Sequence, residues 1–135
     1  MNFLSDVTAE EIKTLSPLVL AHIGDAYFHL YVRTKLLKTT HNVNKLHNLS
    51  AKIVSAVAQA KAYKNIEQNL TDEERDIFRR GRNAKSHSPR AATVHEYHAS
   101  TGFEALLGKL FLHKNFERLN EICDMAFDFI FEELQ

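Results

Sequence analysis

Apolar residues recur at spacings of three and four along most of this chain, and they almost nowhere alternate with polar residues. This periodicity predicts helices throughout and no strand. Only four glycines and two prolines interrupt it. Three Thr-x-x-Glu sequences, which begin at Thr8, Thr71 and Thr93, are capping boxes that mark helix starts. We therefore expect an all-α fold.

One predicted helix differs from the others because it is apolar nearly all round. Ser16 and Pro17 supply an N-cap and a first-turn proline, and the pattern continues to about Lys38. A helix without a polar face is typical of a central, buried position. Asp25 lies in the middle of this helix.

Besides the short helix that begins at Thr8, the rest of the chain predicts four more helices. The first, over about residues 43–65, has one apolar stripe and exposed lysines, and a short helix follows Thr71 and ends at Gly81. The helix that opens at Thr93 contains Glu104. On the last helix an apolar face is opposed by the acids Glu117, Glu121, Asp124 and Asp128.

Length and composition bound the class of protein. A chain of 135 residues predicts a single domain over residues 1–135. No apolar run approaches the roughly 20 residues that cross a bilayer, so we expect no membrane span. The N-terminus carries no cationic leader, and Cys123 has no cysteine partner, which favours the cytoplasm.

Affinity for a polyanion cannot come from the overall charge, because the formal net charge is zero. It would need a local concentration of base, and the segment from Arg79 to Arg90 contains no acid. A solvated loop would explain this segment as well as a nucleic-acid contact does. The candidate RNA-binding residues are Arg79, Arg80, Arg82, Asn83, Lys85 and Arg90.

Two acids sit beside glycines inside predicted helices. Gly24 precedes Asp25, and Gly102 and Gly108 flank Glu104. A glycine in a helix interior costs about 1 kcal/mol relative to alanine, so these positions predict a close approach of another backbone or of a ligand. Two such helices could bring both acids to one site. An acid that pairs with a base or a helix end would explain Asp25 alone equally well.

These residues carry a resemblance to the ribonuclease III family. Residues 23–26, Ile-Gly-Asp-Ala, resemble its signature helix, and residues 103–108, Phe-Glu-Ala-Leu-Leu-Gly, resemble its second acidic motif. Residues 46–59 resemble the helix between those motifs, and residues 79–85 resemble a stretch of the compact Mini-ribonuclease III branch. The resemblance covers about residues 15–112.

Two positions depart from the usual family pattern. Ala21 stands where the signature commonly has glutamate, and Thr101 stands where an aspartate commonly precedes the second glutamate. Mini-ribonuclease III proteins share this reduced set of acids. They also lack the C-terminal double-stranded-RNA-binding domain of the family, and no residues for such a domain follow Gln135. Both departures therefore favour that branch.

The resemblance implies a ribonuclease III-type helical endonuclease domain that cleaves double-stranded RNA. It implies that Asp25 and Glu104 are the catalytic residues and hold Mg²⁺, for which Mn²⁺ can substitute. It also implies a homodimer, products with 5′-phosphate and 3′-hydroxyl ends, and the 23S ribosomal RNA precursor as substrate. The basic segment would contact RNA phosphates.

Three other interpretations stay open from the sequence. His22, Asp25 and His29 share one helix face and could form a transition-metal site. A noncatalytic RNA-binding scaffold would explain the loss of two usual acids. A plain helical dimerisation module, with the acids in internal salt bridges, would leave the two joint motifs unexplained.

Overall fold

Helices follow one another through residues 2–84 and 93–135, which are the residues that this computed structural model describes. In chain order the elements are η1 (Asn2–Asp6), α1 (Ala9–Thr14), α2 (Pro17–Leu36), α3 (Val43–Ile53), α4 (Ala56–Ile66), η2 (Glu67–Asn69), α5 (Asp72–Asn83), α6 (Val94–Leu112) and α7 (Phe116–Glu133). No strand occurs in those two ranges, so the predicted all-α fold is confirmed. Nor does this part of the chain contain a helix long and apolar enough to cross a membrane.

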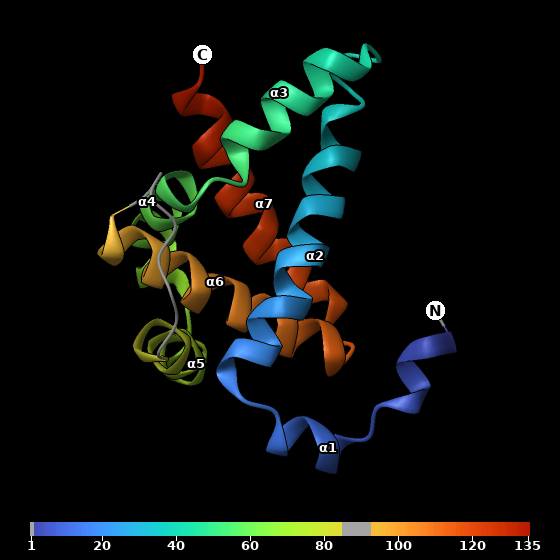
Figure 1. Cartoon of the computed structure of the whole chain (residues 1–135), viewed down its shortest axis with the longest axis vertical. Coiled ribbons are helices and arrows are strands. Elements are labelled where there is room, and N and C mark those ends of the chain that lie inside the picture. The colour runs from blue at the N-terminus through green and yellow to red at the C-terminus, as the bar shows by residue number, and fades with distance from the viewer. Residues whose placement is uncertain (1, 85–92) are drawn as a thin grey trace.

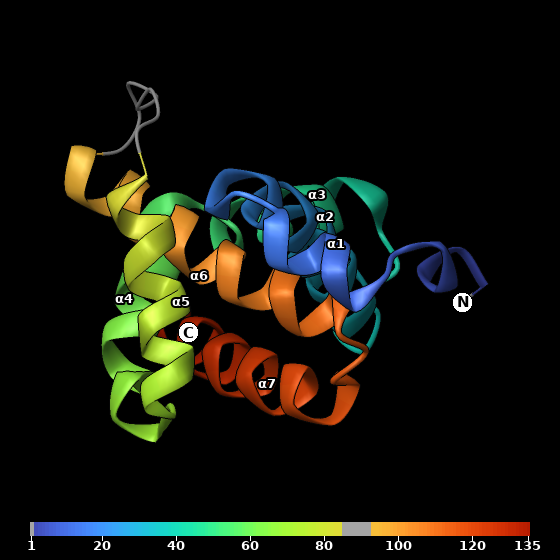
Figure 2. The ribbon, with the colours of Figure 1, turned by 90° about the horizontal axis from the view of Figure 1, so that it is seen from below.

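The central helix of the molecule is α6, which contacts α2, α4, α5 and α7 (Figure 1 and Figure 2). Phe103, Leu106 and Leu107 on α6 are fully buried. The sequence assigned this central place to the helix that begins after Ser16, and that interpretation was wrong. Helix α2 buries one side against α6, while Leu30 on its outer side remains exposed.

The N-terminal ends of the helices follow the predicted capping chemistry. Thr8, Thr71 and Thr93 each accept a hydrogen bond from the backbone three residues later, and the glutamate there binds back to the cap. Ser16 caps α2, with Pro17 in its first turn. Each cap satisfies backbone N–H groups that have no partner within the helix. All four predicted helix starts are therefore confirmed.

The single helix predicted over residues 43–65 is two helices, α3 and α4. Between them Val54 leaves helical geometry and Ser55 becomes an N-cap, with its hydroxyl accepting a hydrogen bond from the amide of Ala58. A serine side chain competes in this way with the backbone bonds that would continue a helix. The bend brings Gln59, in the first half of α4, to the interior.

Gly81 was also misassigned as the end of its helix. It lies inside α5 with ordinary helical geometry, and the helix continues to Asn83. A Cβ at this position would lie 2.8 Å from the Cα of Gly102 on α6. The glycine is needed because two helices pack closely there, and a sequence pattern within α5 cannot show that contact.

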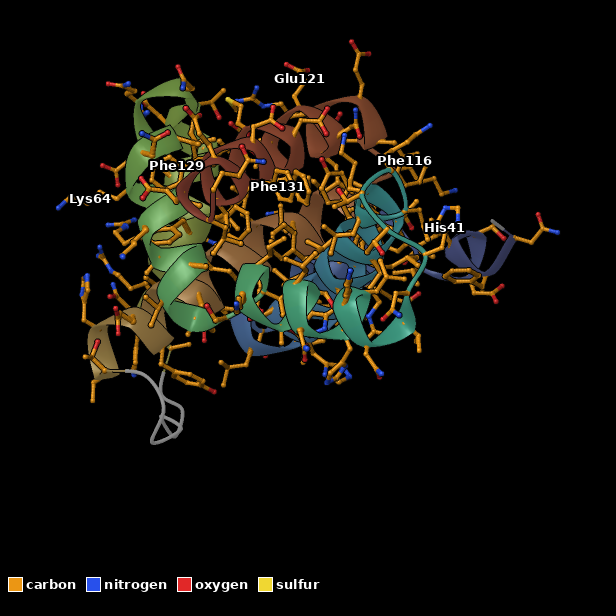
Figure 3. The ribbon with its side chains drawn as sticks, turned by 90° about the horizontal axis from the view of Figure 1, so that it is seen from above. His41, Lys64, Phe116, Glu121, Phe129 and Phe131 are labelled. Carbon is orange, nitrogen blue, oxygen red and sulfur yellow. The ribbon has the colours of Figure 1, made fainter. Side chains whose placement is uncertain are left out.

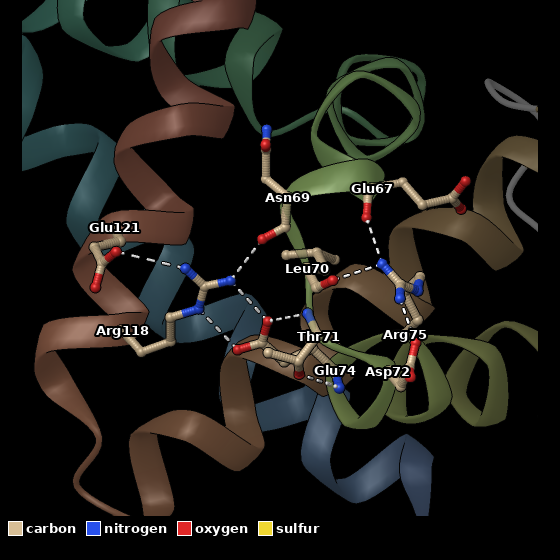
Figure 4. A network of polar contacts seen from close by, with 9 residues as sticks. All are labelled: Glu67, Asn69, Leu70, Thr71, Asp72, Glu74, Arg75, Arg118 and Glu121. Atoms are coloured by element: carbon tan, nitrogen blue, oxygen red, sulfur yellow. Dashed lines mark hydrogen bonds and ion pairs between the residues drawn. The ribbon is translucent and has the colours of Figure 1, made fainter.

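Helix α7 closes the other side of the core. Its C-terminal end, where Figure 3 labels Phe129 and Phe131, lies beside α3 and α4. Near its N-terminal end, Arg118 donates to both carboxylate oxygens of Glu74 at 2.8 Å and to the carbonyl of Asn69 at 2.9 Å (Figure 4). This network ties α7 to the cap of α5.

Candidate active site

Asp25 projects from the middle of α2 toward a cavity between α2, α4 and α6. Its side chain is half exposed, with 51% of its surface accessible, so it is less buried than the apolar pattern of the helix suggested. The imidazole Nε2 of His29, one turn later, lies 3.2 Å from the Asp25 Oδ1. Asp25 therefore retains an oxygen that can bind a ligand from the cavity.

Glu104 enters the same cavity from α6. It lies between Gly102 and Gly108, and its Oε2 accepts a hydrogen bond of 3.1 Å from the side-chain amide of Gln59. Because Gln59 belongs to α4, three helices that are distant along the chain contribute to this one site.

Backbone contact between α2 and α6 brings the two acids together. A Cβ added to Gly24 would lie 2.7 Å from the carbonyl carbon of Glu104 and 2.8 Å from the amide nitrogen of Gly108. A Cβ added to Gly108 would lie 2.8 Å from the carbonyl carbon of Leu20. No side chain fits in either place, so the predicted close approach at these glycines is present. Each glycine is adjacent to or one turn from an acid.

The cavity between these helices has a volume of about 390 Å³. Its lining residues are Leu18, Ala21, His22, Asp25, Val54, Ala56, Gln59, Tyr97, Ser100, Thr101 and Glu104. A second surface cavity, of about 300 Å³ between α2 and α3, contains no carboxylate in its lining. Of these two cavities, the first therefore offers paired acids for a cation.

The electrostatics of the site favour a cation. Burial, and secondarily the neighbouring Asp25, raise the pKa of Glu104 above its usual range, while the hydrogen bond from Gln59 opposes that rise. Two carboxylates that face one small cavity repel each other when both are charged. A divalent cation between them would relieve this repulsion and hold both in the ionised form.

Ala21 and Thr101, which stand where the family pattern described above has two further acids, add no carboxylate to this cavity. Ala21 lines it with a methyl group, and the hydroxyl of Thr101 donates to the carbonyl of Tyr97 at 3.1 Å. Through residues 2–84 and 93–135, no three His, Cys, Asp or Glu side chains gather as metal ligands. This finding argues against the transition-metal site of His22, Asp25 and His29.

The basic segment is only partly free to bind a polyanion. Arg79 and Arg80 both pair with Asp76, and the hydrogen bond from Arg79 is the main reason that the pKa of Asp76 is lowered. Arg82 lies over the ring of Phe78, with its guanidinium carbon 5.8 Å from the ring centroid. The exposed Asn83 ends α5. The candidates Lys85 and Arg90 lie outside the described residues.

Gln59 is the site residue that sequence reasoning missed. Its side chain is 1% exposed and contacts Glu104, yet it fell outside the apolar stripe of a helix that was predicted to be continuous. The available signal was Ser55, four residues earlier, which marks a helix start. Tyr97 and Ser100, one turn before Thr101 and Glu104, were also missed as lining residues.

Comparison with known sequences agrees with the resemblance that the two acidic motifs carry. The ribonuclease III domain matches residues 18–115. A Mini-ribonuclease 3 from Thermoanaerobacter sp. (strain X514) is 47% identical over 98% of this chain and 96% of its own length. The Mini-ribonuclease 3 of Symbiobacterium thermophilum is 48% identical over 87% of this chain and 92% of its own. That of Staphylococcus aureus is 46% identical over 84% and 87%.

Comparison with solved structures agrees with this result. A crystal structure of a protein from Fusobacterium nucleatum superposes with a TM-score of 0.78 and is 33% identical. The match covers 84% of this chain and 93% of the other. Similarity to these proteins therefore extends over both motif helices and the helices that surround the cavity.

Proposed function

Because this chain belongs to the ribonuclease III family, with Mini-ribonuclease 3 proteins among its relatives, we propose that Asp25 and Glu104 hold the divalent cation of its active site. The chain is a ribonuclease III-type endoribonuclease that acts on double-stranded RNA, and the family is generally dependent on divalent metals. The proposal rests on one observation, which is that acids from α2 and α6 line a single cavity.

Mg²⁺ fits this donor set, and Mn²⁺ can substitute for it. Mg²⁺ takes oxygen ligands and usually keeps several waters, so one or two carboxylates together with substrate phosphate are sufficient. The buried Gln59 Oε1 also has no hydrogen-bond partner among the residues that the structure describes, which suits a site that water enters. With two carboxylates the free protein should bind the cation loosely, and RNA should tighten that binding.

When bound, Mg²⁺ polarises a phosphate oxygen and lowers the pKa of water. The residues of the chain hold the cation and fix the positions of its ligands. Asp25 and Glu104 provide carboxylate oxygens to the cavity, and the contact at Gly24 fixes the distance between their helices. Gln59 restrains Glu104 from the third side. Hydrolysis at this site would leave 5′-phosphate and 3′-hydroxyl ends.

In the sequence, the RNA-binding residues that we propose lie between Gln59 and Tyr97 of the cavity lining. The C-terminal end of α5 joins α6 at the side of the cavity, because His98 binds the carbonyl of Arg82 at 2.9 Å. Arg82 and Asn83 therefore lie near the helix that carries Glu104. Phosphate contacts would come from Arg79, Arg80, Arg82, Asn83, Lys85 and Arg90. Recognition would depend on the shape of the A-form duplex more than on sequence.

We further propose that residues 1–135 form one catalytic unit, that it acts as a homodimer in the cytoplasm, and that its substrate is the 23S ribosomal RNA precursor. Two copies would cut opposite strands of one duplex. A noncatalytic RNA-binding scaffold is the alternative from the sequence, and the retention of both Asp25 and Glu104 in one cavity argues against it.

A cleavage assay tests the proposal. A perfectly paired RNA is incubated with the protein and Mg²⁺ or a chelator, beside Asp25→Asn and Glu104→Gln. Chelation and either substitution should lower the rate by at least about a hundredfold, because each removes part of the cation site. The exposed acids of α7 provide matched controls, Asp128→Asn and Glu117→Gln, which should cleave normally. Cleavage that persists in both site variants would overturn the assignment.

A further inference from the structure

Gln59 is a buried polar side chain at the candidate active site. In the described part of the chain its amide nitrogen is hydrogen-bonded and its amide oxygen is not. The residue lies on α4, 1% exposed, in the lining of the same cavity as Asp25 and Glu104. Its nitrogen Nε2 donates to the Glu104 Oε2 at 3.1 Å and to the carbonyl of Val54 at 2.9 Å. Its oxygen Oε1 is buried and, in the described part of the chain, accepts no hydrogen bond.

The two partners fix the orientation of this amide. A carboxylate oxygen and a backbone carbonyl are both acceptors, so the Gln59 nitrogen must face them and its oxygen must face away. The reversed amide would place an oxygen against the Val54 carbonyl, whatever the protonation of Glu104. Buried polar atoms in native proteins nearly always have a partner, either protein or water. In an occupied site the Gln59 oxygen would therefore need a water molecule as its partner.

The other residues around Glu104 explain why the hydrogen bond from Gln59 matters. Within the described residues, Gln59 is the neighbour from another helix that donates an N–H hydrogen bond to Glu104. Ala21 and Thr101 provide no further acid, so the position of each remaining carboxylate matters more. Partners that orient a metal ligand without touching the metal commonly change the metal affinity by about 10–100-fold.

We propose that Gln59 is a positioning residue of this enzyme: its amide nitrogen holds Glu104 in the cavity, and its oxygen accepts a hydrogen bond from a water molecule of the occupied site. This inference rests on the proposed role of Asp25 and Glu104. The hydrogen bond to Val54 fixes the amide to the bend between α3 and α4. That bend thereby sets the position of a carboxylate on α6.

The test measures Mn²⁺ binding to the RNA-free protein by electron paramagnetic resonance. Gln59→Met keeps the volume but loses both polar atoms, and it should weaken Mn²⁺ binding about tenfold. The Mg²⁺ concentration for half-maximal cleavage should rise in parallel, while RNA affinity in chelator stays unchanged. Ile122→Val, in the core on α7, is the control for general loss of stability. Mn²⁺ affinity of Gln59→Met within twofold of the parent would overturn the inference.

A measurement on the unaltered protein covers the case in which Gln59→Met does not fold. In a ¹⁵N spectrum, titration with Mg²⁺ should shift the side-chain amide of Gln59, while those of Gln68 and Gln135 serve as internal references. A Gln59 signal that moves no more than these two would contradict the inference. If Asp25→Asn and Glu104→Gln bind Mn²⁺ as the parent does, the proposed metal site itself is wrong.

Discussion

Replacing Gly24 by alanine tests whether backbone contact between α2 and α6 fixes the position of both acids. The added Cβ would lie 2.7 Å from the carbonyl carbon of Glu104 and 2.8 Å from the nitrogen of Gly108, where an ordinary contact is 3.4 Å or more. Both neighbours belong to a helix backbone and cannot rotate away. The carbonyl oxygen of Glu104 lies closer still, so the two helices must separate by more than the roughly 0.7 Å that the carbonyl carbon alone requires.

The expected change in the free energy of unfolding of Gly24→Ala is the sum of two opposing effects. Forcing extra atoms into a packed interior typically costs about 1–3 kcal/mol, and a backbone neighbour places this case near the upper end. Alanine gains roughly 1 kcal/mol over glycine from helix propensity. The net loss should be about 2 kcal/mol, which lowers the Tm by roughly 6–8 °C. Because misplacement of reacting groups by about 1 Å can cost a hundredfold in rate, cleavage should fall by about that factor.

Urea unfolding and initial rates on a paired RNA, at saturating Mg²⁺, measure both effects of Gly24→Ala. The matched control is Ala26→Gly, on the exposed side of the same helix. It should lose about 1 kcal/mol through helix propensity and retain normal cleavage. If Gly24→Ala is as stable as the parent and cleaves within about threefold of it, the contact does not position the acids.

Three further predictions concern charge. Burial raises the pKa of Glu104, so this group destabilises the fold increasingly as the pH rises above about 4.5. Glu104→Gln in chelator should therefore raise the Tm by roughly 5 °C at pH 8 and scarcely at pH 4, and equal gains at both would contradict this. Arg118→Met should lower the free energy of unfolding by about 3 kcal/mol, because it leaves Glu74 buried without its partner, and a loss below about 1 kcal/mol in urea would refute that reasoning. Arg82→Ala with Lys85→Ala should reduce the slope of log affinity against log salt by about 2 for RNA binding, whereas an unaltered slope removes this segment from the interface.

Local chemistry was readable from the sequence, and most of the tertiary packing was not. The helix starts at Thr8, Thr71 and Thr93 were predicted because a capping box depends only on residues three apart. Gly81 was misassigned because its need for glycine comes from Gly102 on another helix. The same limit applies to the central helix, whose place depends on which elements surround it.

At the candidate site, too, local signals were readable from the sequence and contacts between helices mostly were not. Gly24 pointed to a close helix contact, since an interior glycine has a local cost that packing must explain. Gln59 gave no such signal, because in one continuous helix it falls outside the apolar stripe, on a side where a polar residue is expected at the surface. Its burial depends on the bend at Ser55, which sequence periodicity treated as continuous helix. The contact with Glu104 follows only from the three-dimensional fold.

Anomalous diffraction from crystals soaked in Mn²⁺ tests the central claim most directly. The account predicts one anomalous peak per chain within coordination distance of carboxylate oxygens of both Asp25 and Glu104, and no such peak in crystals of Asp25→Asn. A peak that contacts neither acid, or one that persists unchanged in the variant, would contradict it.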